Sequence, residues 1–340
     1  MDKPLCHAWQ VMFPPLQQHA QGWLDVGDGH SMYWQECGNP LGTPALFIHG
    51  GPGAGCKSDD SRWFDPARYR IVLFDQRGAG RSRPSGRLMA NTTPHLLADM
   101  ETLRRHLHIE RWVLFGGSWG AALALAYAQR HPRRVHALIL RGVFTASAAQ
   151  CRWLYAPEGA GARHSAAWQR FTSSLGLGPG TNLLDAFAAR LHSGDAGTEE
   201  QAARAWLQWE QDLMALEAAA PAPAARSQFD GEAALAAARI GVHYARHGFF
   251  LRDAPWLDAG LHALPCVIVQ GANDLVTPPA TALALHRSWP GAQLRYVAAA
   301  GHAGSHPEMA RELIAATDSF QEAMHLRHMA GVHRRRRDTR

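Results

Sequence analysis

The chain has 340 residues, of which 46% are hydrophobic and 19% are charged. This composition supplies enough apolar material for one large or two modest folded domains, and too little charge for a disordered chain. The sequence contains no apolar run near the roughly 18 residues that cross a bilayer. Its N-terminus lacks the apolar segment of a signal peptide. We therefore expect no membrane association and no export by that route.

The net charge of +5 is concentrated at one end of the chain. Residues 333–340 hold five Arg and one Asp, so the rest of the chain is close to neutral. A basic tail on a near-neutral globule does not make a nucleic-acid-binding face, and we expect no nucleic-acid partner. We expect the tail, over residues 326–340, to be solvated and disordered, with an anchor for an anionic surface as the alternative.

Cysteine usage indicates the redox compartment. Five cysteines are dispersed without a C-x-x-C pair, at Cys6, Cys37, Cys56, Cys151 and Cys266. An odd, scattered set indicates reduced thiols in a cytoplasmic protein and not a disulfide framework or a zinc site. The histidine pair at 302 and 306 lacks the glutamate of a zinc-protease helix, so we expect no metal.

Strand and helix patterns alternate over the first 146 residues. Asp28-Gly29 predicts a hairpin turn, and Thr93 followed by Pro94 predicts the N-cap and first residue of a helix. Apolar residues at helical spacing extend that helix to about Leu107. The predicted strands cover 23–26, 32–36, 45–49, 70–75, 112–116 and 135–142, with a second helix over 119–130. This alternation predicts a mostly parallel sheet covered by helices on both faces.

The middle of the chain has a different character. Residues 147–257 are rich in Ala, Trp and Arg, have helical patterns broken by Pro and Gly, and contain no convincing buried strand. Strands over 266–270 and 293–298 then alternate with helices over 279–288 and 307–324. We interpret 147–257 as a helical cap inserted into one α/β core formed by 22–146 and 258–325. Such an insertion belongs at the carboxyl ends of the strands, where open α/β sheets bind ligands.

The strongest local motif is Gly116-Gly117-Ser118-Trp119-Gly120, which ends a predicted strand and opens a helix. It fits the G-x-S-x-G nucleophile elbow, in which small neighbours permit a tight turn that exposes the serine hydroxyl. The first amides of the helix then face the serine and stabilise negative charge. The alternative is a glycine-rich turn whose serine only caps the helix.

A serine nucleophile needs a base that is itself oriented by a third group. On this fold the partners follow in the order Ser, acid, His. Asp274 comes directly after the strand CVIVQ, and His302 follows the next predicted strand in a loop containing Gly301 and Gly304. We therefore assign Ser118, Asp274 and His302 as a catalytic triad. A turn aspartate and an exposed loop histidine are the alternatives.

Backbone amides are expected to stabilise the oxyanion that forms during attack. One is the amide of Trp119, directly after the nucleophile. The other belongs to the glycine-rich loop 49–55, where Gly51 is the first candidate and Gly50 the second. This loop lacks the lysine and spacing of a phosphate-binding loop, so nucleotide binding is disfavoured.

Several sequence blocks resemble the proline iminopeptidase (prolyl aminopeptidase) family of serine α/β-hydrolases. The blocks are HGGPGAG (49–55), FDQRGAGRSRP (74–84), GGSWGAALALAYAQRHP (116–132), LRGVF (140–144), GANDLVTPP (271–279) and AGH (300–302). The resemblance extends from about residue 22 to residue 323. It implies an α/β-hydrolase that releases an N-terminal proline from small peptides without a metal or cofactor. It also implies the triad and oxyanion roles assigned above.

The resemblance further implies how the substrate is recognised. The family's W-x-x-W-E pattern appears at 206–210, so Glu210 is the carboxylate expected to meet the free imino group of the substrate. A protonated amine that enters a closed pocket needs such a partner. The alternative for Glu210 is a surface glutamate on an amphipathic helix. Phe144 is implied to line the pocket of the proline ring, with a core aromatic at the sheet edge as its alternative.

One position departs from the family pattern. A second glutamate is usual in a stretch that here reads ARIGVHYA (238–245), and Gly241 stands in its place. Loss of one partner of a buried charged pair costs about 2–5 kcal/mol in binding. Either the site manages with Glu210 alone, or another acid substitutes, or the specificity has drifted toward uncharged esters or amides, which is the second hypothesis. A non-catalytic ligand-binding protein on the same fold is the third. The sequence leaves the oligomeric state open.

Overall fold

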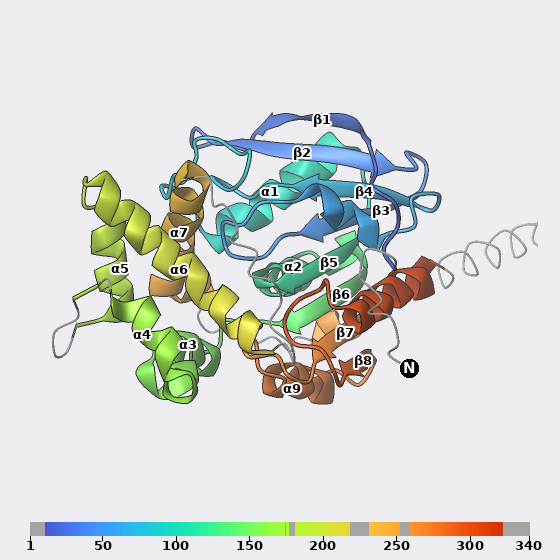
Figure 1. Ribbon diagram of the computed structural model, residues 1–340. Coiled ribbons are helices and arrows are strands. Elements are labelled where there is room, and N and C mark those ends of the chain that lie inside the picture. Colours follow the sequence, from blue (N-terminus) through green and yellow to red (C-terminus); the bar gives the residue numbers. More distant parts are fainter. Residues whose placement is uncertain (1–10, 174, 177–180, 218–230, 252–258, 322–340) are drawn as a thin grey trace, which may run out of the picture.

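A computed structural model describes residues 11–173, 175–176, 181–217, 231–251 and 259–321 (Figure 1). Its centre is an eight-stranded sheet with strand order β1-β2-β4-β3-β5-β6-β7-β8. The strands are β1 (Gln18–Asp25), β2 (Ser31–Gly38), β3 (Thr43–Ile48), β4 (Tyr69–Phe74), β5 (Trp112–Ser118), β6 (Val135–Val143), β7 (Cys266–Gly271) and β8 (Ala292–Val297). β2 pairs antiparallel with both β1 and β4, and all pairings from β4 to β8 are parallel. The mostly parallel α/β architecture is confirmed.

The first two strands form the hairpin that the sequence predicts, but they are longer than predicted. Asp28 and Gly29 both have positive φ, and the amide of His30 bonds the carbonyl of Gly27. Positive φ at both central residues is the requirement of a type I′ hairpin turn. β1 begins five residues before the predicted start, because backbone pairing with β2 holds a polar edge segment that has no apolar pattern.

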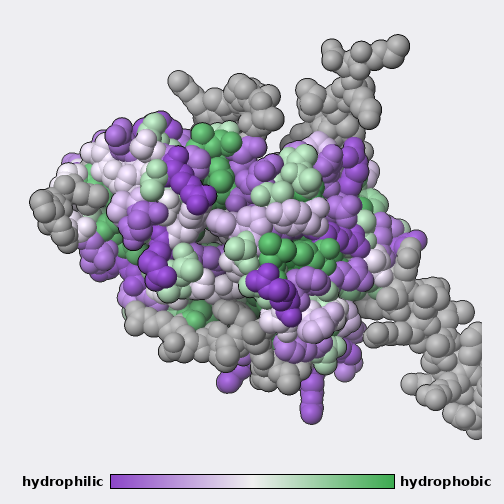
Figure 2. All heavy atoms as spheres, turned by 90° about the horizontal axis from the view of Figure 1, so that it is seen from below, coloured by the Kyte–Doolittle hydropathy of each residue, from purple (hydrophilic) through white to green (hydrophobic). Residues whose placement is uncertain are grey.

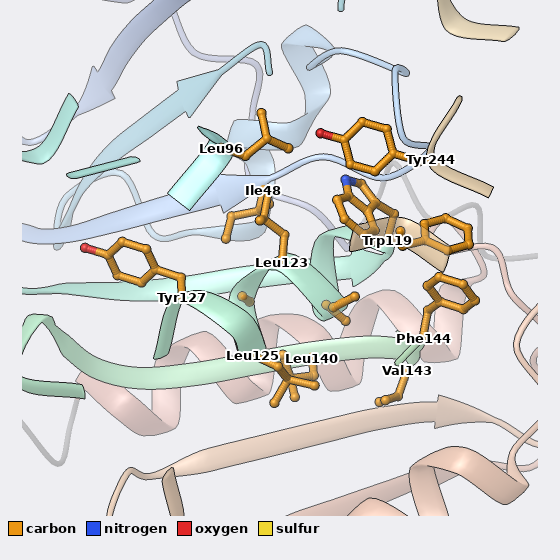
Figure 3. Close-up of a cluster of buried hydrophobic side chains, with 14 of the residues drawn as sticks. Ile48, Leu96, Trp119, Leu123, Leu125, Tyr127, Leu140, Val143, Phe144 and Tyr244 are labelled. Atoms are coloured by element: carbon orange, nitrogen blue, oxygen red, sulfur yellow. The ribbon is translucent and has the colours of Figure 1, made fainter. Parts of the chain in front are cut away.

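Helices cover both faces of the sheet. The described helices outside the inserted segment are α1 (Thr93–His106), α2 (Trp119–Arg130), α8 (Ala259–His262), α9 (Ala280–Ser288), the 3₁₀ helices η2 (Ser58–Trp63) and η3 (Pro132–Arg134), and the helix over 307–321. Alternating strand residues point into two separate cores. α1, α2 and α9 pack in the core that contains Ile48 and Leu140, where Leu96 and Leu123 lie between helix and sheet (Figure 3). η2 and the helix over 307–321 pack in the other core.

Some element boundaries differ from the prediction. The N-cap of α1 is Thr92 and not Thr93, which is the first helical residue. β5 continues two residues beyond the predicted end to Ser118, and β6 continues to Val143, because the two strands keep pairing up to the carboxyl edge. These extensions bring the serine to the edge where the site lies. The last predicted helical residues, 322–324, lie outside the described residues.

Between β6 and β7 the described residues form helices and turns and no strand. The main helices are α3 (Ala148–Tyr155), α4 (Ser165–Ser173), α5 (Leu183–Leu191), α6 (Ala196–Glu217) and α7 (Gly231–Arg246). They gather beside the sheet as one helical group, in which α6 runs back toward β7 (Figure 1). Phe171, Phe187, Trp206 and Trp209 pack against one another inside this group. Aromatic packing therefore holds the helices together.

The face of the molecule seen from below is mostly hydrophilic, with apolar side chains in several separate groups (Figure 2). Within the described residues, every helix is too short or too polar to cross a membrane. The basic tail over 326–340 and the end of the predicted cap, 252–257, lie outside the described residues.

Candidate active site

The serine of the G-x-S-x-G motif lies on a sharp turn between β5 and α2. Ser118 has φ 57° and ψ −124°, a backbone conformation that side-chain-bearing residues rarely adopt. A Cβ atom on Gly116 would lie 2.2 Å from the carbonyl oxygen of Gly120, and one on Gly120 would lie 2.1 Å from that of Ile48. The turn is therefore possible only with glycine at both positions. It places the serine at the N-terminus of α2, where unpaired amides stabilise negative charge.

The predicted acid and base lie in the loops that follow β7 and β8, and they are in direct contact. Nδ1 of His302 lies 2.9 Å from Oδ2 of Asp274. Both side chains are buried, with 4% and 0% of their surface exposed. An Nδ1–H that donates to this carboxylate leaves Nε2 of the imidazole unprotonated in the neutral ring. Nε2 is then the atom able to accept the proton of a hydroxyl.

The carboxylate of Asp274 is held by several donors. Oδ1 accepts hydrogen bonds from the amides of Val276 and Thr277, at 3.0 and 2.7 Å. Oδ2 accepts from the hydroxyl of Thr277 at 2.8 Å and from the amide group of Gln270 at 3.1 Å. Burial opposes ionisation, but the charge of His302 and the hydrogen bonds outweigh it and lower the pKa of Asp274. The acid is therefore ionised and fixed in orientation.

Ser118 and His302 line one cleft of about 640 Å³, together with Gly50, Gly51 and Glu210. The structure thus brings the serine into the same cavity as the imidazole, although the two are far apart in the sequence. Gly51 and Trp119 also lie with Ser118 in a narrower pocket that adjoins this cleft. Both predicted oxyanion donors therefore lie beside the serine. A Cβ built on Gly50 would lie 3.6 Å from the Cβ of Ser118, so the glycine loop approaches the serine closely.

A glutamine that the sequence reasoning missed ties these parts together. Nε2 of Gln76 donates to the carbonyl of His49 at 3.0 Å, and its Oε1 accepts from the indole of Trp119 at 2.9 Å. The amide of Gln76 also bonds the ring of His49 at 3.0 Å. Blocks 49–55, 74–84 and 116–132 therefore meet at one buried side chain. The presence of all three blocks in the sequence could have pointed to a shared site, but it did not show that Gln76 contacts His49 and Trp119.

The narrow pocket is apolar apart from a few polar groups. Phe144 is buried in its wall and packs edge-to-face on Phe249, with ring centroids 4.8 Å apart. Figure 3 shows Phe144 on the same side of the core as Trp119. Glu210 lines both cavities, and its Oε1 lies 3.8 Å from Nε2 of His302. Its side chain is 43% exposed, because it faces the open cleft.

Gly241 lies in the wall of the same pocket, on α7. A Cβ at this position would lie 2.6 Å from Nε1 of Trp206, so the indole occupies the space next to the glycine. Trp206 is held there by face-to-face stacking on Tyr155, with centroids 5.2 Å apart. Where the family pattern has a glutamate, this pocket therefore has a glycine with the indole of Trp206 packed beside it. Of the described side chains lining this pocket, Glu210 is the one carboxylate.

Glu217, at the end of α6, is a second residue that the sequence reasoning missed. Its two carboxylate oxygens accept hydrogen bonds from the amides of Leu275 and His302, at 2.7 and 2.6 Å. Burial raises the pKa of Glu217, against the lowering effect of these two bonds. No sequence motif marked this residue, because its partners are backbone groups of distant loops.

The described residues contain no cluster of three or more His, Cys, Asp or Glu side chains able to hold a metal ion. The site presents a serine at a strained turn, an imidazole fixed by a carboxylate, and amides at a helix N-terminus.

Fold and site together define an α/β-hydrolase, and residues 43–308 match the family described as the alpha/beta hydrolase fold. The chain is 42% identical to a proline iminopeptidase of Xanthomonas citri, covering 92% of this chain and 99% of the relative. It is 41% identical to a proline iminopeptidase of Arabidopsis thaliana, covering 93% and 83%. The chain belongs to the proline iminopeptidase family.

Solved structures of low sequence identity share the fold. A proline iminopeptidase-related protein of Thermus thermophilus has a TM-score of 0.58 and 22% identity, covering 91% of this chain and 98% of that one. An esterase from Exiguobacterium antarcticum has a TM-score of 0.60 and 19% identity, covering 89% and 100%. The same scaffold therefore carries peptidase-related and esterase proteins.

Proposed function

We propose that this protein is a serine aminopeptidase that releases N-terminal proline from small peptides without a metal or cofactor. One observation carries the proposal: Ser118 opens into the same cleft as an imidazole whose Nδ1 is bonded to a buried carboxylate. Membership of the proline iminopeptidase family supplies the substrate class. The peptide needs a free imino nitrogen at its N-terminus.

The reaction proceeds through an acyl-enzyme. Oγ of Ser118 attacks the carbonyl carbon of the prolyl residue while Nε2 of His302 takes the hydroxyl proton. The amides of Gly51 and Trp119 stabilise the oxyanion. Collapse of this intermediate breaks the C–N bond, and His302 gives its proton to the leaving amine. Water then attacks the prolyl ester, His302 takes a proton from that water, and the proton returns to Oγ as proline leaves.

Each supporting residue has a specific role in this scheme. Asp274 keeps the imidazole in the tautomer that has a free Nε2 and stabilises its protonated form. Phe144 contributes an apolar wall for the pyrrolidine ring, and Glu210 accepts the protonated imino nitrogen. We assign α3–α7 as a cap, because residues of α6 and α7 line the cavities that adjoin Ser118.

The decisive experiment compares prolyl 4-nitroanilide with cyclopentanecarbonyl 4-nitroanilide, which has the same ring without the nitrogen, and with the N-acetylated prolyl substrate. We expect turnover of the free prolyl amide only. Ser118→Ala should lower kcat by at least about 10³-fold with an unchanged unfolding temperature. Retained activity in that variant contradicts the proposal.

Glu210→Gln tests recognition of the imino group. Hydrogen bonds to charged groups contribute about 1.5–3 kcal/mol, so kcat/KM for the free prolyl amide should fall about 10- to 150-fold. Glu200→Gln is a matched control, because Glu200 is an exposed glutamate on the same helix that pairs with Arg204. Equal losses in the two variants contradict the assignment of Glu210.

A second candidate function is an esterase or amidase that needs no free amine. The specific observation in its favour is Gly241 beside the indole of Trp206, where the family pattern has a second glutamate. If this candidate is correct, the cyclopentanecarbonyl and N-acetylated substrates are hydrolysed as fast as the free prolyl amide, or only esters are cleaved. The same three-substrate comparison therefore separates the two functions.

We place the enzyme in the cytoplasm on the state of its thiols. The described cysteines, Cys37, Cys56, Cys151 and Cys266, are all free. Burial raises the pKa of Cys37 and Cys151 to about 11, so these thiols are unreactive at neutral pH. Such a set suits a reducing compartment.

A further inference from the structure

One carboxylate of the helical group bonds both catalytic loops, and the indole of Trp153 on α3 also donates to the carbonyl of Leu275 at 2.7 Å. Oε1 of Glu217 accepts from the amide of Leu275, which directly follows Asp274, and Oε2 accepts from the amide of His302 itself. Both bonds are short, at 2.7 and 2.6 Å. One side chain of α6 therefore fixes the loop of the proposed acid and the backbone of the proposed base.

The backbone of His302 is held from its other side as well. Nη1 of Arg141 donates to the carbonyl of His302 at 2.6 Å. Glu217 and Arg141 thus bond the two peptide groups that flank this residue. With its backbone fixed, the imidazole can rotate only about its side-chain bonds, and the bond to Asp274 limits that rotation.

The approach of Glu217 to this loop requires glycine at position 301. A Cβ atom on Gly301 would lie 2.1 Å from Oε2 of Glu217, so a side chain there displaces the carboxylate. The structure therefore offers a second, independent way to remove the same contact without changing Glu217.

Glu217 also lies on the helix that carries the proposed substrate-recognition residue. Glu210 is seven positions earlier on α6, about two helical turns away, and so projects from the same side of the helix. Its Oε1 lies 3.8 Å from Nε2 of His302. The same side of α6 thus contacts His302 at its ring nitrogen and at its backbone amide.

We infer that Glu217 is a positioning residue that aligns His302 and the Asp274 loop with Ser118 and couples this alignment to the seating of α6. This inference rests on the proposed serine-hydrolase chemistry and not on the prolyl specificity. Glu217 reaches the reacting atoms only through His302 and Leu275. Its loss should therefore lower the rate of nucleophilic attack more than the affinity for substrate.

The test measures labelling of Ser118 by a small fluorophosphonate, which has no amine. Oγ of Ser118 bonds to phosphorus, fluoride leaves and the serine proton passes to the base. A 1 Å misplacement of a catalytic group costs about 10²-fold, so Glu217→Ala should slow labelling about 10- to 100-fold. For the prolyl amide, kcat should fall by a similar factor and KM should change less than about threefold. Glu217→Gln, which keeps one acceptor oxygen, should lie between wild type and Glu217→Ala.

Gly301→Ala provides the second variant, and Glu200→Gln the control on the same helix. Gly301→Ala should slow labelling, because its Cβ displaces the side chain of Glu217. Glu200→Gln should label at the wild-type rate. Rates are compared per folded molecule, with folding followed by near-ultraviolet circular dichroism. Wild-type labelling by folded Glu217→Ala, or by folded Gly301→Ala, overturns the inference. Wild-type labelling without prolyl hydrolysis overturns the proposed substrate instead.

Discussion

The indole of Trp206 fills the space that a side chain at position 241 would need. Nε1 of Trp206 lies 2.6 Å from the position of a Cβ on Gly241, closer than real Cβ contacts allow. Trp206 stacks on Tyr155, and all three residues line the narrow pocket beside Ser118. The glycine and the tryptophan are therefore sterically coupled, and the shape of the pocket depends on both.

Gly241→Ala should displace Trp206 and lower kcat/KM for the prolyl amide about tenfold, because an overpacked site costs about 1–3 kcal/mol. The smaller ring in Trp206→Phe makes room for the added methyl. Gly241→Ala should therefore cost less in that background, with a coupling energy of about 1 kcal/mol or more in a double-mutant cycle.

Gly231→Ala is the matched control for this cycle. Gly231 begins the same helix, and a Cβ there meets no atom of the described part of the chain within 4 Å. Its substitution should leave kcat/KM unchanged and leave the unfolding temperature equal or higher. Additive effects of Gly241→Ala and Trp206→Phe would show that the two residues are not coupled.

Gln76→Met should lower kcat at least about tenfold while KM for the prolyl amide changes less than about threefold. The substitution keeps the size of the side chain but leaves the indole of Trp119 and the carbonyl of His49 without these hydrogen bonds. Each unsatisfied buried group costs about 1–3 kcal/mol, so urea denaturation should also show a loss of about 2–6 kcal/mol for the two groups. Gln293→Met, at an exposed position on β8, should change neither kcat nor the free energy of unfolding.

Alanine variants are usually more stable than glycine variants at the same position. The strained backbone of Ser118 predicts the opposite order of stability there. Glycine adopts φ 57°, ψ −124° without strain, and relief of about 1–3 kcal/mol exceeds its entropic cost of about 0.5–1 kcal/mol. Ser118→Gly should therefore have a free energy of unfolding about 1 kcal/mol above that of Ser118→Ala. At Ser319, which is helical, the glycine variant should be the less stable one. The same order at both positions contradicts the strain argument.

The buried ion pair of Glu101 and Arg104 on α1 predicts acid sensitivity. The hydrogen bonds from Arg104 lower the pKa of Glu101 from 4.5 to about 2, against the effect of burial and with support from Tyr127. A lowered pKa stabilises the folded state above pH 4.5, and this contribution is lost as the pH falls from 4.5 toward 2. Between pH 6 and pH 3 the loss is about 2 kcal/mol.

Glu101→Gln removes this titration. The difference in free energy of unfolding between wild type and Glu101→Gln, measured by urea denaturation, should shrink by about 2 kcal/mol from pH 6 to pH 3. A difference that stays constant between pH 6 and pH 3 would contradict the lowered pKa of Glu101.

The sequence by itself determined the architecture and the three residues assigned as the triad. Alternation of apolar runs and helical spacing is a local signal, and so is the glycine pattern around Ser118, where any larger neighbour collides with the turn. The places of Asp274 and His302 followed from the strands before them, because parallel strands end at one edge of the sheet.

Only the tertiary structure decided which distant groups meet. Gln76 and Glu217 carry no motif, since their partners are backbone groups and an indole far along the chain. The consequence of glycine at position 241 also could not be predicted, because the sequence does not show that the indole of Trp206 fills the space beside it. Local patterns record what each segment needs to form its own helix, strand or turn. Contacts between segments depend on how those elements pack, and packing depends on the whole chain.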